Sequence, residues 1–200
     1  MRALRPVAAA VITTGLLSVA GGFYLPAKAV LAQVLLRRAW AATGDRPVRP
    51  WPWARTWPVA RLEVPSLGID EIVLAGDEGA ALAFAPGHVD GTAEPGQPGN
   101  VVVAGHRDTV FAFLGDLTVG DELSLEAADG RIVRYAVTGT AVVHETDSAV
   151  LDPSDASTLT LVTCYPLDGV RPGGPFRYVV RAATTDRALE PSPATAPASP

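Results

Sequence analysis

Residues 158–166 read Thr-Leu-Thr-Leu-Val-Thr-Cys-Tyr-Pro, and this run decides the prediction of the fold. Its apolar and β-branched side chains are typical of a strand buried in a sheet. Pro166 ends the run, so Cys164 lies at the end of the predicted strand, where a thiol is displayed rather than packed. Cys164 is the only cysteine of the chain, which excludes an intramolecular disulfide and a multi-cysteine metal site.

Two more predicted strands carry a polar side chain at one end. Residues 100–106, Asn-Val-Val-Val-Ala-Gly-His, end on His106, and the run that begins at Phe176 has Arg177 at its start. An imidazole can take up the proton of a thiol and return it to a leaving amine, and a guanidinium can hold an oxyanion or a substrate backbone. Together with Cys164, these residues indicate acyl transfer. One cysteine and three scattered histidines show no zinc-ligand spacing.

The chain around these runs predicts short strands separated by turns. A brief helix is expected over 80–85, and Ala-Asp-Gly at 128–130 indicates a hairpin. About eight strands with few helical stretches predict an all-β fold, a closed or nearly closed β-barrel. The expected strands cover 60–64, 69–75, 101–104, 121–127, 131–140, 141–145, 158–163 and 176–183.

The N-terminal forty residues differ from the rest of the chain. The run from Val7 to Leu25 is apolar and uncharged, and it is long enough to cross a bilayer as a helix. An uncleaved anchor and a cleaved signal peptide, with Ala27-Lys28-Ala29 as the cleavage site, both stay open. Either alternative places the remainder on the extracytoplasmic side of the inner membrane. A net charge of −5 argues against nucleic acid as the main partner.

Four segments describe the expected organisation. Residues 1–42 form the anchor or signal and a juxtamembrane helix, which either lies on the membrane surface or packs on the folded domain. Residues 43–59 form a linker with four prolines and three tryptophans, and these tryptophans either pack on the domain or sit at the membrane interface. The catalytic barrel covers 60–185. Residues 186–200 are a disordered tail by composition.

Several motifs resemble those of the sortases, the membrane-anchored cysteine transpeptidases of bacteria. Thr-Leu-Val-Thr-Cys164 resembles the family's T-L-x-T-C motif, and residues 99–109 resemble the strand and turn that carry its histidine. Residues 114–123 look like the segment that follows, and Phe176-Arg177 matches the final strand. The resemblance covers about residues 60–183. Segments 52–62, 83–89 and 164–175 look like the Gram-negative class GN subgroup.

The resemblance implies a β-barrel whose groove brings His106, Cys164 and Arg177 together as catalytic residues. Cys164 would attack the Thr–Gly-type bond of an LPxTG-like C-terminal sorting signal on a secreted protein. An amine on a second molecule would then resolve the thioester. We expect no cofactor and no metal at these residues, and the sequence leaves regulation by a metal open.

Further residues near the motifs have two interpretations each. Thr163, Tyr165 and His88 are candidate substrate-binding residues, although for His88 the favoured interpretation is a packed or surface histidine. Arg181 is a rival of Arg177, because side chains four residues apart on a strand share a face. Asp108 could orient the histidine or cap the following turn.

Three other functions compete with transpeptidation. A hydrolytic cysteine peptidase would use the same three residues with water as the acceptor. A catalytically silent barrel would only bind a sorting-signal-like peptide. An L,D-transpeptidase of peptidoglycan also places a histidine before a cysteine, but Tyr165-Pro166 follows Cys164 where those enzymes usually have an arginine.

Overall fold

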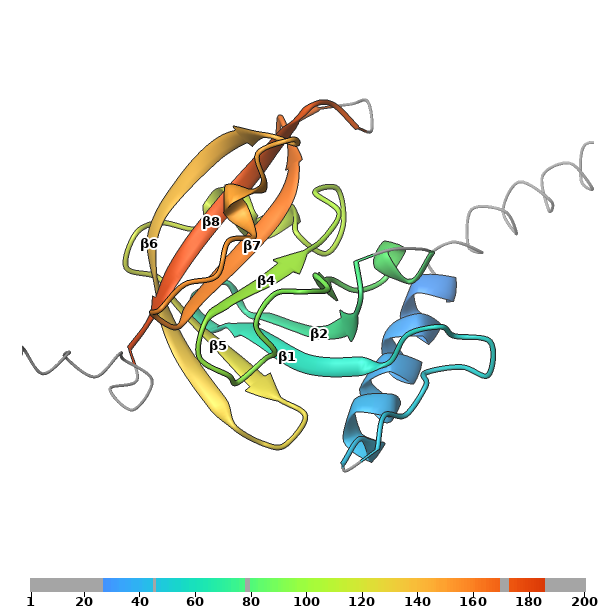
Figure 1. Ribbon diagram of the computed structural model, residues 1–200. Helices are drawn as coiled ribbons and strands as arrows, with labels where there is room; N and C mark the ends of the chain where they lie inside the picture. The colour runs from blue at the N-terminus through green and yellow to red at the C-terminus, as the bar shows by residue number, and fades with distance from the viewer. Residues whose placement is uncertain (1–26, 45, 78–79, 170–172, 186–200) are drawn as a thin grey trace, which may run out of the picture.

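The computed structural model describes residues 27–44, 46–77, 80–169 and 173–185. Within these ranges, eight strands close into a barrel in the order β1-β2-β3-β4-β7-β8-β6-β5 (Figure 1). The predicted all-β barrel of about eight strands is confirmed. The strands are β1 (Pro58–Val64), β2 (Ile69–Ala75), β3 (Gly87–His88), β4 (Asn100–Ala104), β5 (Glu122–Ala127), β6 (Ile132–His144), β7 (Thr158–Tyr165) and β8 (Phe176–Thr184).

Four short 3₁₀ helices lie in the connections. They are η1 (Pro65–Leu67), η2 (Ala80–Ala83), η3 (Ala112–Asp116) and η4 (Ser148–Val150). The brief helix predicted over 80–85 is η2. The segment with η3 follows β4 and buries Phe111 and Leu114 in the barrel core.

The core follows from the alternation of side chains along the strands. In β1 every second residue is buried, as expected for a strand with one face on a core. Apolar side chains from the inner faces meet with almost no exposed surface, and burial of this kind is the main stabilising contribution to such a domain. The inward residues include Leu62, Val64, Val73, Val101, Val103, Leu123, Leu125, Tyr135, Leu159, Leu161, Val180 and Ala182.

Two details of the strand prediction are wrong. Residues 131–140 and 141–145 were expected as separate strands, but β6 runs unbroken through both and pairs with β5 at one end and with β8 along most of its length. A register shift between Val137 and Gly139 lets the strand bend round the barrel without ending. The sequence also gave no sign of β3, since two residues in a Gly/Pro-rich stretch are too short to show a period.

A helix over residues 27–42 packs outside the barrel. Its Leu36 is fully buried against Ile72 and Leu74 on the outer face of β2, with Trp40 and Trp51 packed beside them. This placement favours the alternative in which the segment packs on the folded domain. Val30, Leu31 and Val34 are exposed on the same helix, and Trp53 of the linker is 80% exposed.

The predicted membrane anchor involves residues that the structure does not describe. Among the described residues, none of the helices is long and apolar enough to span a bilayer. The predicted anchor, Val7 to Leu25, and the predicted tail, 186–200, both lie outside the described residues.

Candidate active site

The parallel pairing of β4 with β7 sets the position of the candidate histidine. The two strands run side by side, and Ala104 is the register partner of Val162 at their carboxyl ends. Two residues further along each chain come His106 and Cys164. Because parallel strands advance together, both residues lie at one rim of the barrel, each just past or at the end of its own strand.

Two hydrogen bonds continue this pairing beyond the last register pair. The amide of Gly105 donates to the carbonyl of Val162 at 3.1 Å, and the hydroxyl of Thr163 donates to the carbonyl of Gly105 at 2.7 Å. A Cβ atom on Gly105 would lie 2.8 Å from the ring of Phe111. A glycine is therefore required before His106, because the ring of Phe111 packs so closely there. The two hydrogen bonds also fix the backbone that leads into His106 and into Cys164.

Arg177 lies directly across the sheet from the cysteine. Cys164 and Arg177 are register partners in the antiparallel pairing of β7 with β8, so their side chains project from the same face. The guanidinium donates through Nη1 to the carbonyls of Gly174 and Phe176 at 2.7 and 2.9 Å. Its Nη2 forms an ion pair with Glu145 at 2.7 Å. The arginine is held by its neighbours, and part of its side chain stays exposed.

The three residues lie on the outer face of the barrel wall. The alternation places Cys164 and Arg177 outside, and continued past the end of β4 it places His106 there as well. His106 is exposed and Cys164 is half-buried, as this placement requires. The neighbouring residues that face inward are Val101, Val103, Leu159, Leu161, Val180 and Ala182.

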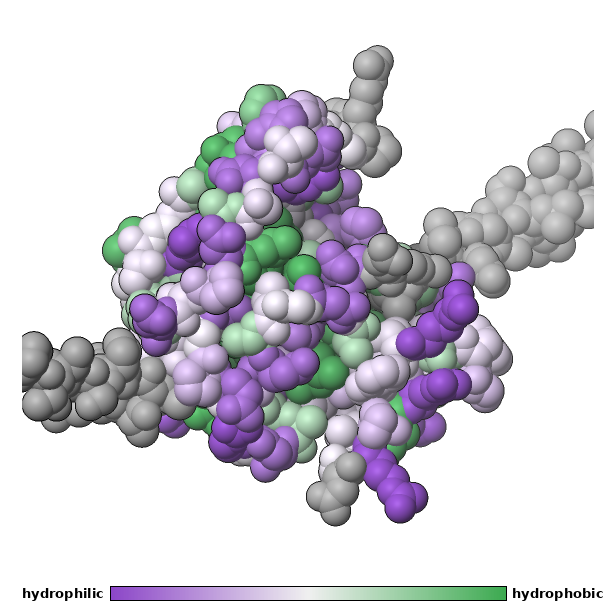
Figure 2. Space-filling model, viewed as in Figure 1, coloured by the Kyte–Doolittle hydropathy of each residue, from purple (hydrophilic) through white to green (hydrophobic). Residues whose placement is uncertain are grey.

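The connection between β6 and β7, residues 145–157, covers the outer face below this rim (Figure 1). The amide of Asn100 donates to the carbonyls of Val150 and Asp152 at 3.0 and 3.1 Å. Arg181 lies at 3.5 Å from the carbonyl of Ala149, so it fastens this connection, whereas Arg177 is the register partner of the cysteine. On the side viewed in Figure 2, apolar surface appears as small areas separated by polar side chains.

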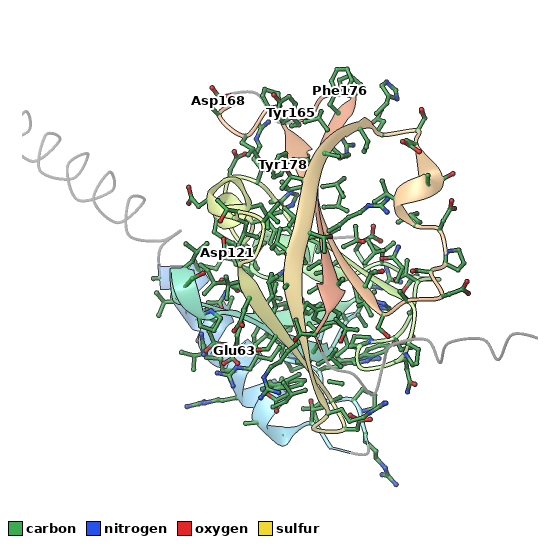
Figure 3. The ribbon with its side chains drawn as sticks, turned by 90° about the vertical axis from the view of Figure 1, so that its left-hand side faces the viewer. Glu63, Asp121, Tyr165, Asp168, Phe176 and Tyr178 are labelled. Atoms are coloured by element: carbon green, nitrogen blue, oxygen red, sulfur yellow. The ribbon has the colours of Figure 1, made fainter. Side chains whose placement is uncertain are left out.

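The candidate substrate-binding residues occupy different places. Thr163 is buried, and its hydroxyl donates to the carbonyl of Gly105, so its side chain supports the backbone. Tyr165 projects from the opposite face to Cys164 and stacks on Tyr178, with ring centroids 6.5 Å apart. Both tyrosines lie with Phe176 at one end of the barrel (Figure 3).

His88 is packed in the barrel wall. It belongs to β3 and is only 4% exposed. Its Nε2 lies 2.9 Å from the carbonyl of Ala93 and 3.1 Å from the hydroxyl of Thr92. These contacts favour the packed histidine over the groove residue, and the structure does not bring His88 together with the other three.

Two charged residues at this rim escaped the sequence analysis. Glu145 pairs with Arg177, and Arg107 donates to the carbonyl of Pro166, 59 positions away in sequence. Asp108 accepts a hydrogen bond from Nε of Arg107 at 3.0 Å. A local pattern could not mark Glu145 or Arg107, because their partners become neighbours only when the barrel closes.

Comparisons with known proteins agree with this architecture. A sortase-domain family model matches residues 62–185, which is more than half of the chain. The chain is 32% identical over 120 residues to Sortase D of Bacillus subtilis (strain 168), and the match spans 60% of each protein. This chain therefore covers less than two thirds of that relative.

Solved structures give the same result. The catalytic domain of B. anthracis SrtD is 35% identical, with a TM-score of 0.55, and the match covers 64% of this chain and 88% of that one. The Clostridium perfringens Sortase D5 transpeptidase has a TM-score of 0.64 over 78% of this chain and 99% of its own, and at 24% identity it supports the fold alone. From the family match over residues 62–185, and in keeping with the rim just described, the chain belongs to the sortase family.

Proposed function

We propose that this sortase is a transpeptidase in which Cys164 is the nucleophile, His106 the acid/base and Arg177 the electrostatic clamp. The observation that supports the proposal is the position of these three residues at one rim of the barrel. Cys164 and Arg177 are direct register partners on β7 and β8. The pairing of β4 with β7 brings His106, which follows β4, beside the end of β7. Acyl transfer by a thiol needs these three functions within one substrate's reach.

The first half of the reaction forms a thioester. The Cys164 thiolate attacks the carbonyl carbon of the scissile peptide bond, and the electron pair moves to the carbonyl oxygen. The guanidinium of Arg177 stabilises the resulting oxyanion or holds the substrate backbone beside it. When the C–N bond breaks, His106 in its protonated form donates a proton to the leaving amine.

The second half releases the acyl group. The amine of an acceptor attacks the thioester carbonyl, and neutral His106 takes the proton that the amine loses. The C–S bond breaks, the thiolate leaves with its electron pair, and a new peptide bond remains. The enzyme returns to the protonation states with which it began.

The substrate and location belong to the same proposal. The acyl donor is a secreted protein with an LPxTG-like C-terminal sorting signal, and the acceptor is an amine. The apolar run from Val7 to Leu25 anchors the enzyme in the inner membrane with the barrel on the extracytoplasmic side. Segments 52–62 and 83–89 favour the class GN subgroup, while the relatives named above carry the name sortase D.

Trapping of the acyl-enzyme tests the proposal. The purified full chain in detergent is incubated with sorting-signal peptides, with and without added amines, and intact mass and peptide mapping follow. We expect an adduct on Cys164 and an amine-dependent ligated product, both absent from Cys164→Ala. Release of free acid alone, whatever amine is offered, would identify a hydrolase. Ligated product formed by Cys164→Ala would end the proposal.

A further inference from the structure

Arg107, the residue after the candidate acid/base, is a buried arginine. Its side chain is only 2% exposed. Nη1 donates to the carbonyl of Pro166 at 2.7 Å, and Nη2 donates to the carbonyl of Gly169 at 2.6 Å. Both carbonyls belong to the connection that leaves β7 after Tyr165, the residue that follows Cys164. One guanidinium thus joins the turn after β4 to the first residues of the β7–β8 connection.

The packing at this joint leaves no spare room. A Cβ atom on Gly169 would lie 2.7 Å from Nη1 of Arg107. A Cβ atom on Gly115, in η3, would lie 2.9 Å from Cδ1 of Leu167. The segment 166–169 is therefore seated against the arginine and against the η3 segment together, and its position depends on both.

Together with the bond from Thr163, the contacts of Arg107 join the backbone before and after His106 and Cys164. On the strand side of His106 and Cys164, Thr163 donates to the carbonyl of Gly105. On the far side, Arg107 donates to the carbonyl of Pro166. His106 and Cys164 therefore each lie between two residues that form these hydrogen bonds, one earlier and one later in the sequence. Their separation is then set by two cross-links that involve neither reactive side chain.

The choice of arginine fits this task. A planar guanidinium presents several donors in a rigid fork and can span two carbonyls, whereas an ammonium on a flexible stem cannot hold both at fixed positions. Burial of a cation costs free energy unless its donors are satisfied. Asp108 supplies a carboxylate at Nε, so the charge has an anionic partner at the surface.

We propose that Arg107 is a positioning residue that fixes the distance between His106 and Cys164 by clamping the β7–β8 connection. This inference rests on the proposed roles of His106 and Cys164. Displacement of a reacting group by about 1 Å can cost on the order of a hundredfold in rate, so a loose clamp acts on turnover. Substrate contacts made elsewhere in the groove keep their geometry.

Two substitutions loosen the clamp from opposite sides. Arg107→Lys keeps the positive charge but loses the fork, and Gly169→Ala pushes a methyl group against the guanidinium. We expect each variant to lower kcat roughly 10–100-fold while KM changes less than about threefold. In the double variant the two effects are expected to be less than additive, because both act on one joint.

Two matched controls accompany these variants. Arg131 also binds a carboxylate and a loop carbonyl, those of Asp129 and Gly96, but at the β5–β6 turn. Arg131→Lys tests the loss of an arginine fork away from the rim. Gly139 has no atom within 4 Å of its would-be Cβ, so Gly139→Ala tests the addition of a methyl group in open space. Both controls are expected to keep kcat within about twofold of the parent.

The test uses the purified full chain and two readouts. The first is the rate of iodoacetamide alkylation, which reports on Cys164 alone because the chain has one cysteine. The second is kcat and KM for peptide transfer, with thermal unfolding recorded for every variant. Slower alkylation and lower kcat at an unchanged melting temperature support the proposal.

Two results would overturn it. Alkylation and kcat within twofold of the parent in both clamp variants would do so. A decrease that only follows the loss of folded protein would do so as well. If instead His106→Ala leaves the parent's alkylation and turnover unchanged, it is the proposed function that fails.

Discussion

A helix covers the outer face of β2, whereas the outer face of β4, β7 and β8 leaves its candidate reactive side chains open at the rim. On the covered face, Leu36 is fully buried and the charged groups pair with one another. On the open face, His106 is exposed and Arg177 is only partly enclosed. The same kind of strand wall thus holds a packed helix on one side and the three candidate catalytic residues on the other, depending on what packs against it.

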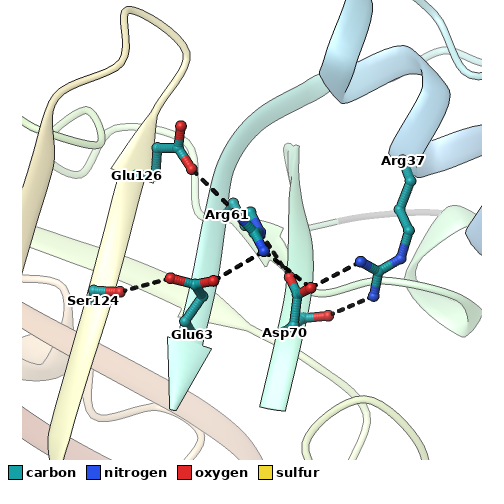
Figure 4. A network of polar contacts seen from close by, with 6 residues as sticks. All are labelled: Arg37, Arg61, Glu63, Asp70, Ser124 and Glu126. Carbon is teal, nitrogen blue, oxygen red and sulfur yellow. Dashed lines mark hydrogen bonds and ion pairs between the residues drawn. The ribbon is translucent and has the colours of Figure 1, made fainter. Parts of the chain in front are cut away.

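The ionic contacts of the covered face show the difference. Asp70 accepts from both Arg37 and Arg61 at 2.8 Å, and Arg61 also pairs with Glu63 (Figure 4). The hydrogen bond from Arg61, helped by Arg37, lowers the pKa of Asp70 from 3.8 to about 2. The pairs are partly exposed, so each contributes no more than about 1 kcal/mol. Their common effect is to orient the helix on the barrel.

Loss of a reacting group at the open rim should give the largest effect. We expect Cys164→Ala and His106→Ala each to abolish formation of ligated product, because one removes the nucleophile and the other the proton carrier. Thermal unfolding should change little, since His106 is exposed and Cys164 is only half-buried. Product analysis by mass spectrometry checks the first point and calorimetry the second. Substantial turnover by either variant would contradict the assignment.

Removal of the Arg177 guanidinium should have the next largest effect. Arg177→Ala is expected to lower kcat/KM by roughly 10²–10³, the usual effect of losing one oxyanion-stabilising donor group. Arg181→Ala is the matched control, because Arg181 lies on the same face four residues along and contacts the carbonyl of Ala149. Steady-state kinetics with one peptide and one amine measure both. Equal losses in the two variants would remove Arg177 from the site.

The covered face should respond in stability and not in chemistry. Leu36→Ala removes a fully buried side chain from the contact with Ile72 and Leu74. We expect the free energy of unfolding to decrease by about 2–5 kcal/mol through lost burial and a residual cavity. Denaturant unfolding measures this, and kcat measured well below the melting temperature should stay at the parent value. A lower kcat in folded protein would show that the helix affects the rim.

The smallest effect concerns pH and Glu71, next to Asp70 on β2. Burial raises the pKa of Glu71 from 4.5 to about 7, with Arg37 opposing and Asp70 adding to the shift. Among the described residues, its Oε2 atom is buried without a hydrogen-bond partner. The folded state therefore holds a proton that the unfolded chain releases above pH 4.5. Stability from this group is fully present below pH 4.5 and is lost as pH rises towards 7.

Glu71→Gln tests this sign. We expect the variant to be more stable than the parent at pH 8 by about 1–3 kcal/mol and to lose less stability between pH 4.5 and pH 8. Urea unfolding at the two pH values gives both quantities. A parent protein that gains stability over this interval relative to Glu71→Gln would contradict the assignment.

The sequence predicted the strands that carry long apolar runs and the three residues at their ends. Val101 to Val103 and the run ending at Cys164 are recognisable because burial on both sides leaves a continuous apolar pattern. Two-residue β3 has too few positions for a period, and the bend at Gly139 keeps β6 in one piece where two strands were expected.

The sequence marks the three candidate residues by their motifs but not the contacts that hold two of them in place. Cys164 and His106 belong to motifs that can be read along the chain. Glu145 and Arg107 act on partners 32 and 59 positions away, so their roles depend on tertiary contacts alone. His88 shows the opposite case, because its motif position is visible in sequence while its bonds to Thr92 and Ala93 are not.

The parallel pairing of β4 with β7 has a consequence for folding. The bond from Thr163 to Gly105 joins residues 58 positions apart, and the whole β5–β6 hairpin lies between them. Neighbouring hairpins can close early, but a parallel contact over such a span carries a larger entropic cost and forms late. A chain in which β4 and β7 are not yet paired has not brought His106 beside Cys164, so the proposed activity at Cys164 would mark a barrel that has closed.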